Sequence, residues 1–85
     1  MRIWQKYDID CKVGGQLLPS ITDDYITAHD EREAIERAMD ELERKLTDEG
    51  YTVERGRFDI IAMAGDEETV WDDFRATELE EWEMD

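Results

Sequence analysis

The chain has 85 residues, of which 40% are hydrophobic. A chain of this size forms one domain and buries roughly 60 to 65% of the surface that it exposes when unfolded. It carries 25 acidic and 10 basic residues, a formal net charge of −15, which disfavours contact with nucleic acid or anionic membranes and favours basic partners. One cysteine excludes an internal disulfide, and no apolar run reaches the length of a membrane span. We therefore expect a single cytoplasmic domain over residues 1–85 that does not associate with membranes.

An alternating pattern opens the chain. Over residues 3–13 the odd positions are mostly apolar and the even positions mostly polar, which predicts a strand with one buried face. Trp4 is the one apolar residue on the polar side. A Gly-Gly pair at 14–15 can turn the chain. A second strand is expected at 24–28, running back along the first.

Residues 30–49 carry the strongest helix signal. The carboxylate of Asp30 can accept from the first helical amides while Glu33 reaches back, as in a capping box. Apolar residues then recur at helical spacing along one stripe, at Ala34, Ile35, Ala38, Met39, Leu42 and Leu46. Acid and base pairs such as Glu33 and Arg37 lie off this stripe. Gly50 is expected to end the helix with a left-handed backbone conformation.

The second half of the chain is expected to complete a sheet. Residues 51–65 are rich in β-branched and aromatic residues, and Gly56 marks a bulge or break inside one long strand. A turn follows at 65–68. Residues 69–77 are interpreted as a fourth strand, and a short helical turn is expected after residue 77. The alternative is one helix over the whole of residues 69–85.

The predicted fold class is α+β, with the order ββαβ(β) and a single helix packed on a three- to four-stranded antiparallel sheet. A single helix covers only one face of such a sheet. The other face is left for solvent, the C-terminal segment or a partner. The residues expected there are Trp4, Ile61, Met63 and Trp71.

Catalytic, cofactor and metal sites find no support in the sequence. His29 and Cys11 are each the only residue of their type, so they form neither a nucleophilic triad of recognisable spacing nor a closed zinc site. Cys11 shares the buried register of the first strand and is interpreted as a small core residue. His29 is interpreted as a surface residue before the helix. The acidic pairs lack the spacing of a calcium-binding loop.

The acidic excess is concentrated at the C-terminal end, where residues 65–85 hold ten acids and one base. Carboxylates held by a rigid fold at spacings of roughly 6 to 7 Å could occupy a Lys/Arg groove that normally holds nucleic acid. Aromatic residues in the same segment could anchor the contact. The expected partner-binding residues are Asp66, Glu67, Glu68, Trp71, Asp72, Asp73, Phe74, Glu78, Glu80, Glu81, Trp82, Glu83 and Asp85.

In size, acidity and hairpin-helix-strand order, the chain resembles the small phage-encoded anti-CRISPR proteins, several of which are acidic mimics of nucleic acid. This resemblance implies a non-enzymatic inhibitor that docks on the basic groove of a CRISPR surveillance complex in the host cytoplasm and blocks target DNA. The partner would be a basic nucleic-acid-binding protein or complex, with no direct binding of nucleic acid.

The stretch "YITAHDEREAIERAMDEL" is similar to the corresponding part of HicB-type antitoxins, which leaves a second interpretation open. The chain would then be a small protein-interaction module of antitoxin or adaptor type. It would contact its partner through an exposed sheet edge or through its C-terminal aromatic residues, and its acidity would serve solubility or life in a high-salt cytoplasm.

Overall fold

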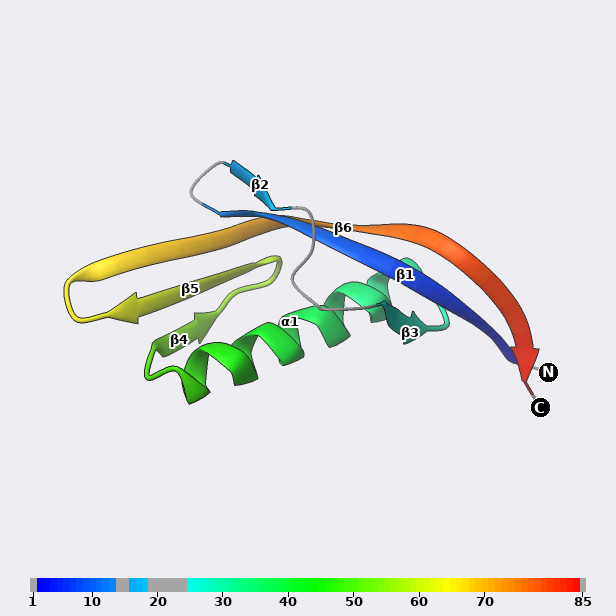
Figure 1. The fold of residues 1–85 in the computed structure, drawn as a ribbon, viewed down its shortest axis with the longest axis horizontal. Coiled ribbons are helices and arrows are strands. Elements are labelled where there is room, and N and C mark those ends of the chain that lie inside the picture. The colour runs from blue at the N-terminus through cyan, green and yellow to red at the C-terminus, as the bar shows by residue number, and fades with distance from the viewer. Residues whose placement is uncertain (1, 14–15, 19–24, 85) are drawn as a thin grey trace.

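The computed structural model describes residues 2–13, 16–18 and 25–84, with side chains for residues 4–13, 16 and 25–79. The predicted turn at 14–15 and the first residue of the strand predicted at 24–28 lie outside the described residues. Within them the chain forms one helix and six strands (Figure 1). In chain order these are β1 (Arg2–Val13), β2 (Gln16–Leu18), β3 (Ile26–Ala28), α1 (Glu31–Asp48), β4 (Thr52–Arg55), β5 (Asp59–Ala64) and β6 (Glu67–Met84).

All strand pairs in the sheet are antiparallel, and the strand order is β2-β1-β6-β5-β4, with β3 also paired to β1. β1 and β6 pair along almost their whole length, from Arg2 opposite Met84 to Val13 opposite Trp71. α1 lies along one face of this curved sheet (Figure 1). The predicted α+β class, with a single helix on an antiparallel sheet, is therefore confirmed, although the sheet has more strands than the three or four expected.

The helix forms where its local signals predict. The backbone N–H of Glu33 donates to the Asp30 carboxylate at 2.8 Å, which satisfies one of the amides left open at the helix start. Gly50, at a φ of 93°, supplies the left-handed residue after the helix end. Glu33 differs from the capping-box expectation, because its carboxylate binds His29 and Arg37.

Residues 51–64 form a hairpin, so the prediction of one long strand is wrong. β4 and β5 pair from Thr52 opposite Met63 to Arg55 opposite Ile60. The backbone N–H of Gly56 donates to the carbonyl of Asp59 at 3.0 Å and closes the loop. A Cβ at Gly56 would overlap the Asp59 carboxylate, so a larger residue here would require the Asp59 side chain to move.

The helical turn predicted after residue 77 is also absent, because β6 continues as a strand to Met84. β1 pairs with this extension as far as Met84, and Trp4 lies opposite Trp82 in the pairing. The turn before β6 is shorter than expected and consists of residues 65–66. Gly65 has a φ of 64°, the positive value that a two-residue hairpin loop requires at its first position.

The core lies between α1 and the sheet face that it covers. The helix contributes the predicted apolar stripe, and β1 contributes the odd positions of its alternating pattern, including Cys11. The buried residues are Tyr7, Ile9, Cys11, Ile26, Ala28, Ala34, Ala38, Met39, Leu42, Leu46, Ile60, Ala62 and Phe74. In the described part of the chain, no helix covers the opposite side of the sheet, which we call the outer face.

Candidate functional site: the outer face of the sheet

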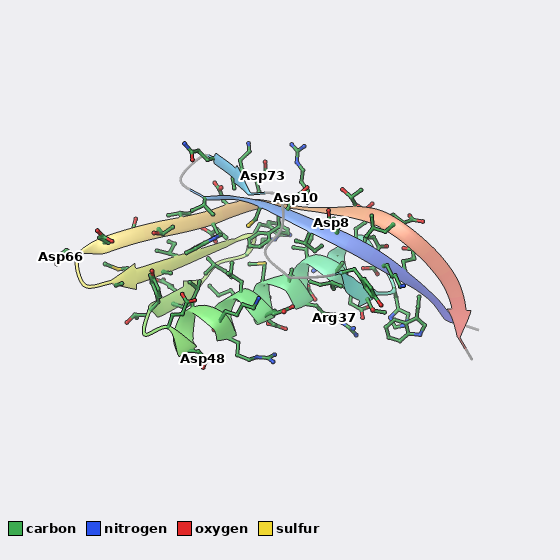
Figure 2. All side chains as sticks on the ribbon, viewed as in Figure 1. Asp8, Asp10, Arg37, Asp48, Asp66 and Asp73 are labelled. Carbon is green, nitrogen blue, oxygen red and sulfur yellow. The ribbon has the colours of Figure 1, made fainter. Side chains whose placement is uncertain are left out.

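Strand alternation decides which side chains reach the outer face. Tyr7 and Ile9 of β1 are buried in the core, so Asp8 and Asp10 point away from α1. Ile60 of β5 is also buried, so Asp59 points the same way. Figure 2 shows the positions of the labelled Asp8, Asp10 and Asp73 along the sheet. β1 and β5, which flank β6, thus contribute carboxylates to one surface.

A bulge in β6 brings two consecutive aspartates to this surface. Asp73 has a φ of 51°, and the register of β1 with β6 shifts between Asp10 and Lys12, opposite this point. The extra residue lets Trp71 and Phe74 both face α1 while Asp72 and Asp73 lie on the outer side. The bulge therefore separates the aromatic and acidic residues of "WDDF" onto opposite faces.

The charges on this face are only partly balanced. Asp73 pairs with Lys12 at 3.2 Å and lies 3.8 Å from Arg75. Asp59 and Asp72 are direct partners across β5 and β6, an arrangement of like charges that destabilises a sheet. We call Asp8, Asp10, Asp59, Asp72 and Asp73 the outer carboxylate cluster.

Asp10 is only partly exposed to solvent. Its Oδ1 atom is buried and has no hydrogen-bond partner among the described residues. Burial, together with the nearby charges of Asp10 and Asp72, raises the pKa of the Cys11 thiol to about 11. Cys11 is therefore a protonated, poorly nucleophilic core residue at neutral pH.

The structure separates the predicted partner-binding residues. Asp66, Glu67, Glu68 and Glu78 are exposed. Phe74 is a core residue with 8% of its surface exposed, and Trp71 is half-buried against the same core. Neither aromatic residue is available as an exposed anchor, and the expectation that Trp71 lies on the outer face is wrong. The backbones of Glu80, Glu81, Trp82 and Glu83 lie in β6, and Asp85 lies outside the described residues.

Apolar residues on the outer face come from β5 and β6. Ile61 lies opposite Val70, and Met63, with 42% of its surface exposed, lies opposite Glu68. Ile61 and Met63 alternate with the buried Ile60 and Ala62 and therefore point outward, as expected from the sequence. Val70 was not identified from the sequence, because its position depends on the register between β5 and β6.

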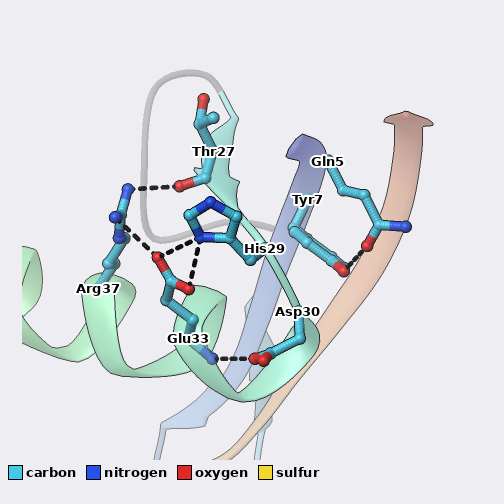
Figure 3. Close-up of polar contacts among 7 residues, drawn as sticks. All are labelled: Gln5, Tyr7, Thr27, His29, Asp30, Glu33 and Arg37. Atoms are coloured by element: carbon cyan, nitrogen blue, oxygen red, sulfur yellow. Dashed lines mark hydrogen bonds and ion pairs between the residues drawn. The ribbon is translucent and has the colours of Figure 1, made fainter. Parts of the chain in front are cut away.

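Trp4 packs on a polar cluster at the start of α1, whose hydrogen bonds and ion pairs are drawn in Figure 3. Its ring packs on the imidazole of His29, with 4.0 Å between ring centroids, and the Arg37 guanidinium lies 5.6 Å from the Trp4 ring. The Nδ1 atom of His29 lies 3.0 Å from the Glu33 carboxylate, which also pairs with Arg37 at 2.7 Å. Arg37 donates to the carbonyl of Thr27 at 2.7 Å and so ties the helix to β3.

The same cluster changes the ionisation of Glu33. Burial alone would raise the pKa of this carboxyl, but the hydrogen bonds with His29 and the charge of Arg37 outweigh burial and lower the pKa below its ordinary value of 4.5. The sequence signal for this contact is the i, i+4 spacing of His29, Glu33 and Arg37. The contact of His29 with Trp4 depends on strand pairing. The contacts of this cluster fix the helix start to the sheet.

A groove of about 410 Å³ lies between α1 and the loop joining β4 to β5. Apolar atoms come mainly from Ile35, Met39 and the 56% exposed Phe58, and four charged side chains complete the lining. These are Glu31, Arg32, Glu36 and Arg57. The mixed charges give the groove no preference for a ligand of one sign.

Within the described residues, no group of three or more His, Cys, Asp or Glu side chains is placed to hold a metal ion. The helix that the structure describes does not combine the length and apolarity needed to cross a membrane. Searches against family models, curated proteins and solved structures find no match to this chain.

Proposed function

We propose that the protein is a non-enzymatic inhibitor that mimics nucleic acid and occupies the basic groove of a nucleic-acid-binding protein or complex, such as a CRISPR effector. The observation that carries this proposal is the outer carboxylate cluster, which collects acidic side chains from β1, β5 and β6 on one face. The net charge of −15 adds a long-range attraction to any basic groove.

The sheet suits this task because it fixes its carboxylates before binding. Alternate residues on a strand, such as Asp8 and Asp10, are about 6.5 to 7 Å apart, and adjacent strands are about 4.8 Å apart. A preformed grid of negative charge presents a basic groove with closely spaced anions, as nucleic acid does. Little conformational entropy would then be lost on binding, which favours a rigid mimic over an unstructured acidic tail.

The opposed pair of Asp59 and Asp72 also favours a basic partner. The isolated protein holds these like charges opposite each other on neighbouring strands, at a cost to the sheet. A Lys or Arg from a partner would reduce this repulsion. Binding would therefore relieve an unfavourable interaction that folding alone leaves in place.

The test is displacement of labelled duplex DNA from a purified nucleic-acid-binding complex, with a CRISPR effector as the first choice. The wild-type protein should displace DNA, and the effect should weaken between about 50 and 200 mM salt. The triple variant Asp59→Asn, Asp72→Asn and Asp73→Asn should lose most of this activity. The matched control, Glu31→Gln, Glu41→Gln and Asp48→Asn on α1, removes as many charges and should lose much less.

Two results would contradict the proposal. Equal activity of wild type and the triple outer-face variant would show that these carboxylates do not make the contact. Equal losses in both triple variants would show that total charge matters and that its arrangement does not. Circular dichroism of each variant establishes that the fold persists.

A second candidate function follows from the free edge of the sheet. Among the described residues β4 pairs only with β5, so its other edge has unpaired backbone groups. Such an edge can accept a strand from a partner, as a small adaptor or antitoxin module would require. A complex that is insensitive to salt and slows hydrogen exchange at the β4 amides would favour this function over mimicry.

A further inference from the structure

We propose that the outer face of β4, β5 and β6 is a docking surface for a basic partner segment that also carries aliphatic side chains. This inference deepens the proposed function and takes from it the positive charge of the partner. It adds an apolar contact on β5 and β6. The surface consists of Ile61, Met63 and Val70 at the centre, with Glu54, Asp59, Glu68 and Asp72 around them, and we call it the hairpin face.

The strand register places these residues in three rows. Met63 stands between Thr52 of β4 and Glu68 of β6. Ile61 stands in the next row, between Glu54 and Val70. The third row pairs Asp59 with Asp72, which lies opposite Lys12 on its other side. Lys12 is itself paired with Asp73, so the margin of the hairpin face remains acidic.

The apolar side chains at the centre of the hairpin face do not pack in the core. α1 packs on the opposite side of the sheet, over Ile60 and Ala62. Met63 is 42% exposed, and Ile61 and Val70 are half-buried beside it. An apolar centre within a polar rim is the usual composition of a protein interface, and an unbranched Met side chain adapts readily to a partner.

Charge complementarity identifies the occupant. Four carboxylates surround the apolar centre, so a segment containing Lys or Arg would gain contacts at the rim while its aliphatic side chains cover the centre. Arginine suits both roles, because its methylene stem can pack on apolar surface while its guanidinium reaches a carboxylate. A second copy of the chain is disfavoured, since two such faces would oppose eight carboxylates.

Two synthetic peptides test the apolar part of the contact. One alternates Arg with Leu, and the other has the same number of Arg residues with Ser in place of Leu. Fluorescence anisotropy at about 0.15 M salt measures the dissociation constant of each for the wild-type protein. We expect the Leu peptide to bind about tenfold more tightly, because its aliphatic side chains are transferred from water to the apolar centre of the hairpin face.

Single substitutions at three positions locate the contact. Met63→Ser should reduce the preference for the Leu peptide to about threefold or less, while binding of the Ser peptide stays nearly unchanged. Leu79→Ser is the matched control, because Leu79 is 58% exposed and lies outside the three rows. Phe58→Ser tests the groove beside α1 as the competing site. On the wild-type protein, the Leu peptide should shift the amide resonances of residues 59–63 and 68–72.

The inference would be overturned by equal affinities of the two peptides for wild type, or by resonance shifts confined to α1. It would also be overturned if Leu79→Ser or Phe58→Ser removed the preference as fully as Met63→Ser does. Self-association in sedimentation experiments that Met63→Ser abolishes would assign the face to a second copy. A preference for the Leu peptide without displacement of DNA would contradict nucleic-acid mimicry and still support the docking surface. Displacement of DNA without a preference for the Leu peptide would contradict the docking surface and still support mimicry.

Discussion

The fold determines the reactivity of Cys11. The thiol is buried, and its pKa is raised to about 11 by that burial and by the nearby Asp10 and Asp72. We expect a disulfide reagent such as 5,5′-dithiobis(2-nitrobenzoate) at pH 8 to react with the folded protein only at the rate of its opening, and to react within minutes in urea. Rapid labelling of the folded protein would contradict this account.

Glu33 makes the free energy of unfolding depend on pH. Its pKa is lowered in the folded state, so the ionised carboxylate stabilises the fold above the unfolded pKa of 4.5. This stabilisation should decrease as the pH falls below 4.5 and be absent once the folded group is protonated. The difference in free energy of unfolding between wild type and Glu33→Gln, measured in urea from pH 6 to pH 3, should narrow over this range. A difference that is constant with pH would contradict the prediction.

At the scale of elements, β6 holds the two halves of the sheet together. It lies between β1 and β5, so a chain that ends at Ala64 loses the strand that joins them. We expect the protein truncated after Ala64 to be unfolded, because the apolar faces of β1 and β5 would lose their common neighbour. Far-UV circular dichroism should then lack a cooperative urea transition. A retained transition would show that β6 is dispensable.

Elements with local signals could be predicted from the sequence. The cap at Asp30, the apolar stripe and Gly50 lie within or next to α1, and the alternating pattern of β1 lies within that strand. The hairpin of β4 and β5 is not predicted, because Gly56 is interpreted as an interruption of one strand. The end of β6 is not predicted, because its extension depends on pairing with β1, from Tyr7 opposite Glu78 to Arg2 opposite Met84, far apart in the sequence.

The difference between local signals and contacts distant in the sequence also explains what could be predicted of the candidate site. The acidity of the C-terminal segment is a property of composition and is visible in the sequence. The contributions of Asp8, Asp10 and Asp59 are not, because they reach the outer face only through the register of three strands. The burial of Phe74 depends on a bulge at Asp73, where the change in side-chain direction breaks simple alternation.

At the scale of the whole molecule, charge and shape act together. The protein measures 48 × 23 × 22 Å and carries a net charge of −15, so its carboxylates repel one another along an elongated body. Added sodium chloride shortens the Debye length from about 10 Å at 0.1 M to about 3 Å at 1 M. We expect the free energy of unfolding to rise over this interval.

Urea titrations at each salt concentration check this prediction, with the triple variant of Asp59, Asp72 and Asp73 as the comparison. The variant should gain less from salt, because it has less repulsion to screen. Stability that falls with salt would show that attractive pairs such as Lys12 with Asp73 outweigh the repulsion. A chain that folds only in molar salt would favour the interpretation of its acidity as adaptation to a high-salt cytoplasm.

Laboratory evolution would act on Asp59 and Asp72 in opposite directions, depending on what is selected. Because these carboxylates oppose each other across β5 and β6, a library screened only for heat resistance should discard one of them early. A library screened for affinity to a cationic target should retain both. Sequencing the two selected populations would therefore show whether this pair is maintained for recognition at the expense of stability.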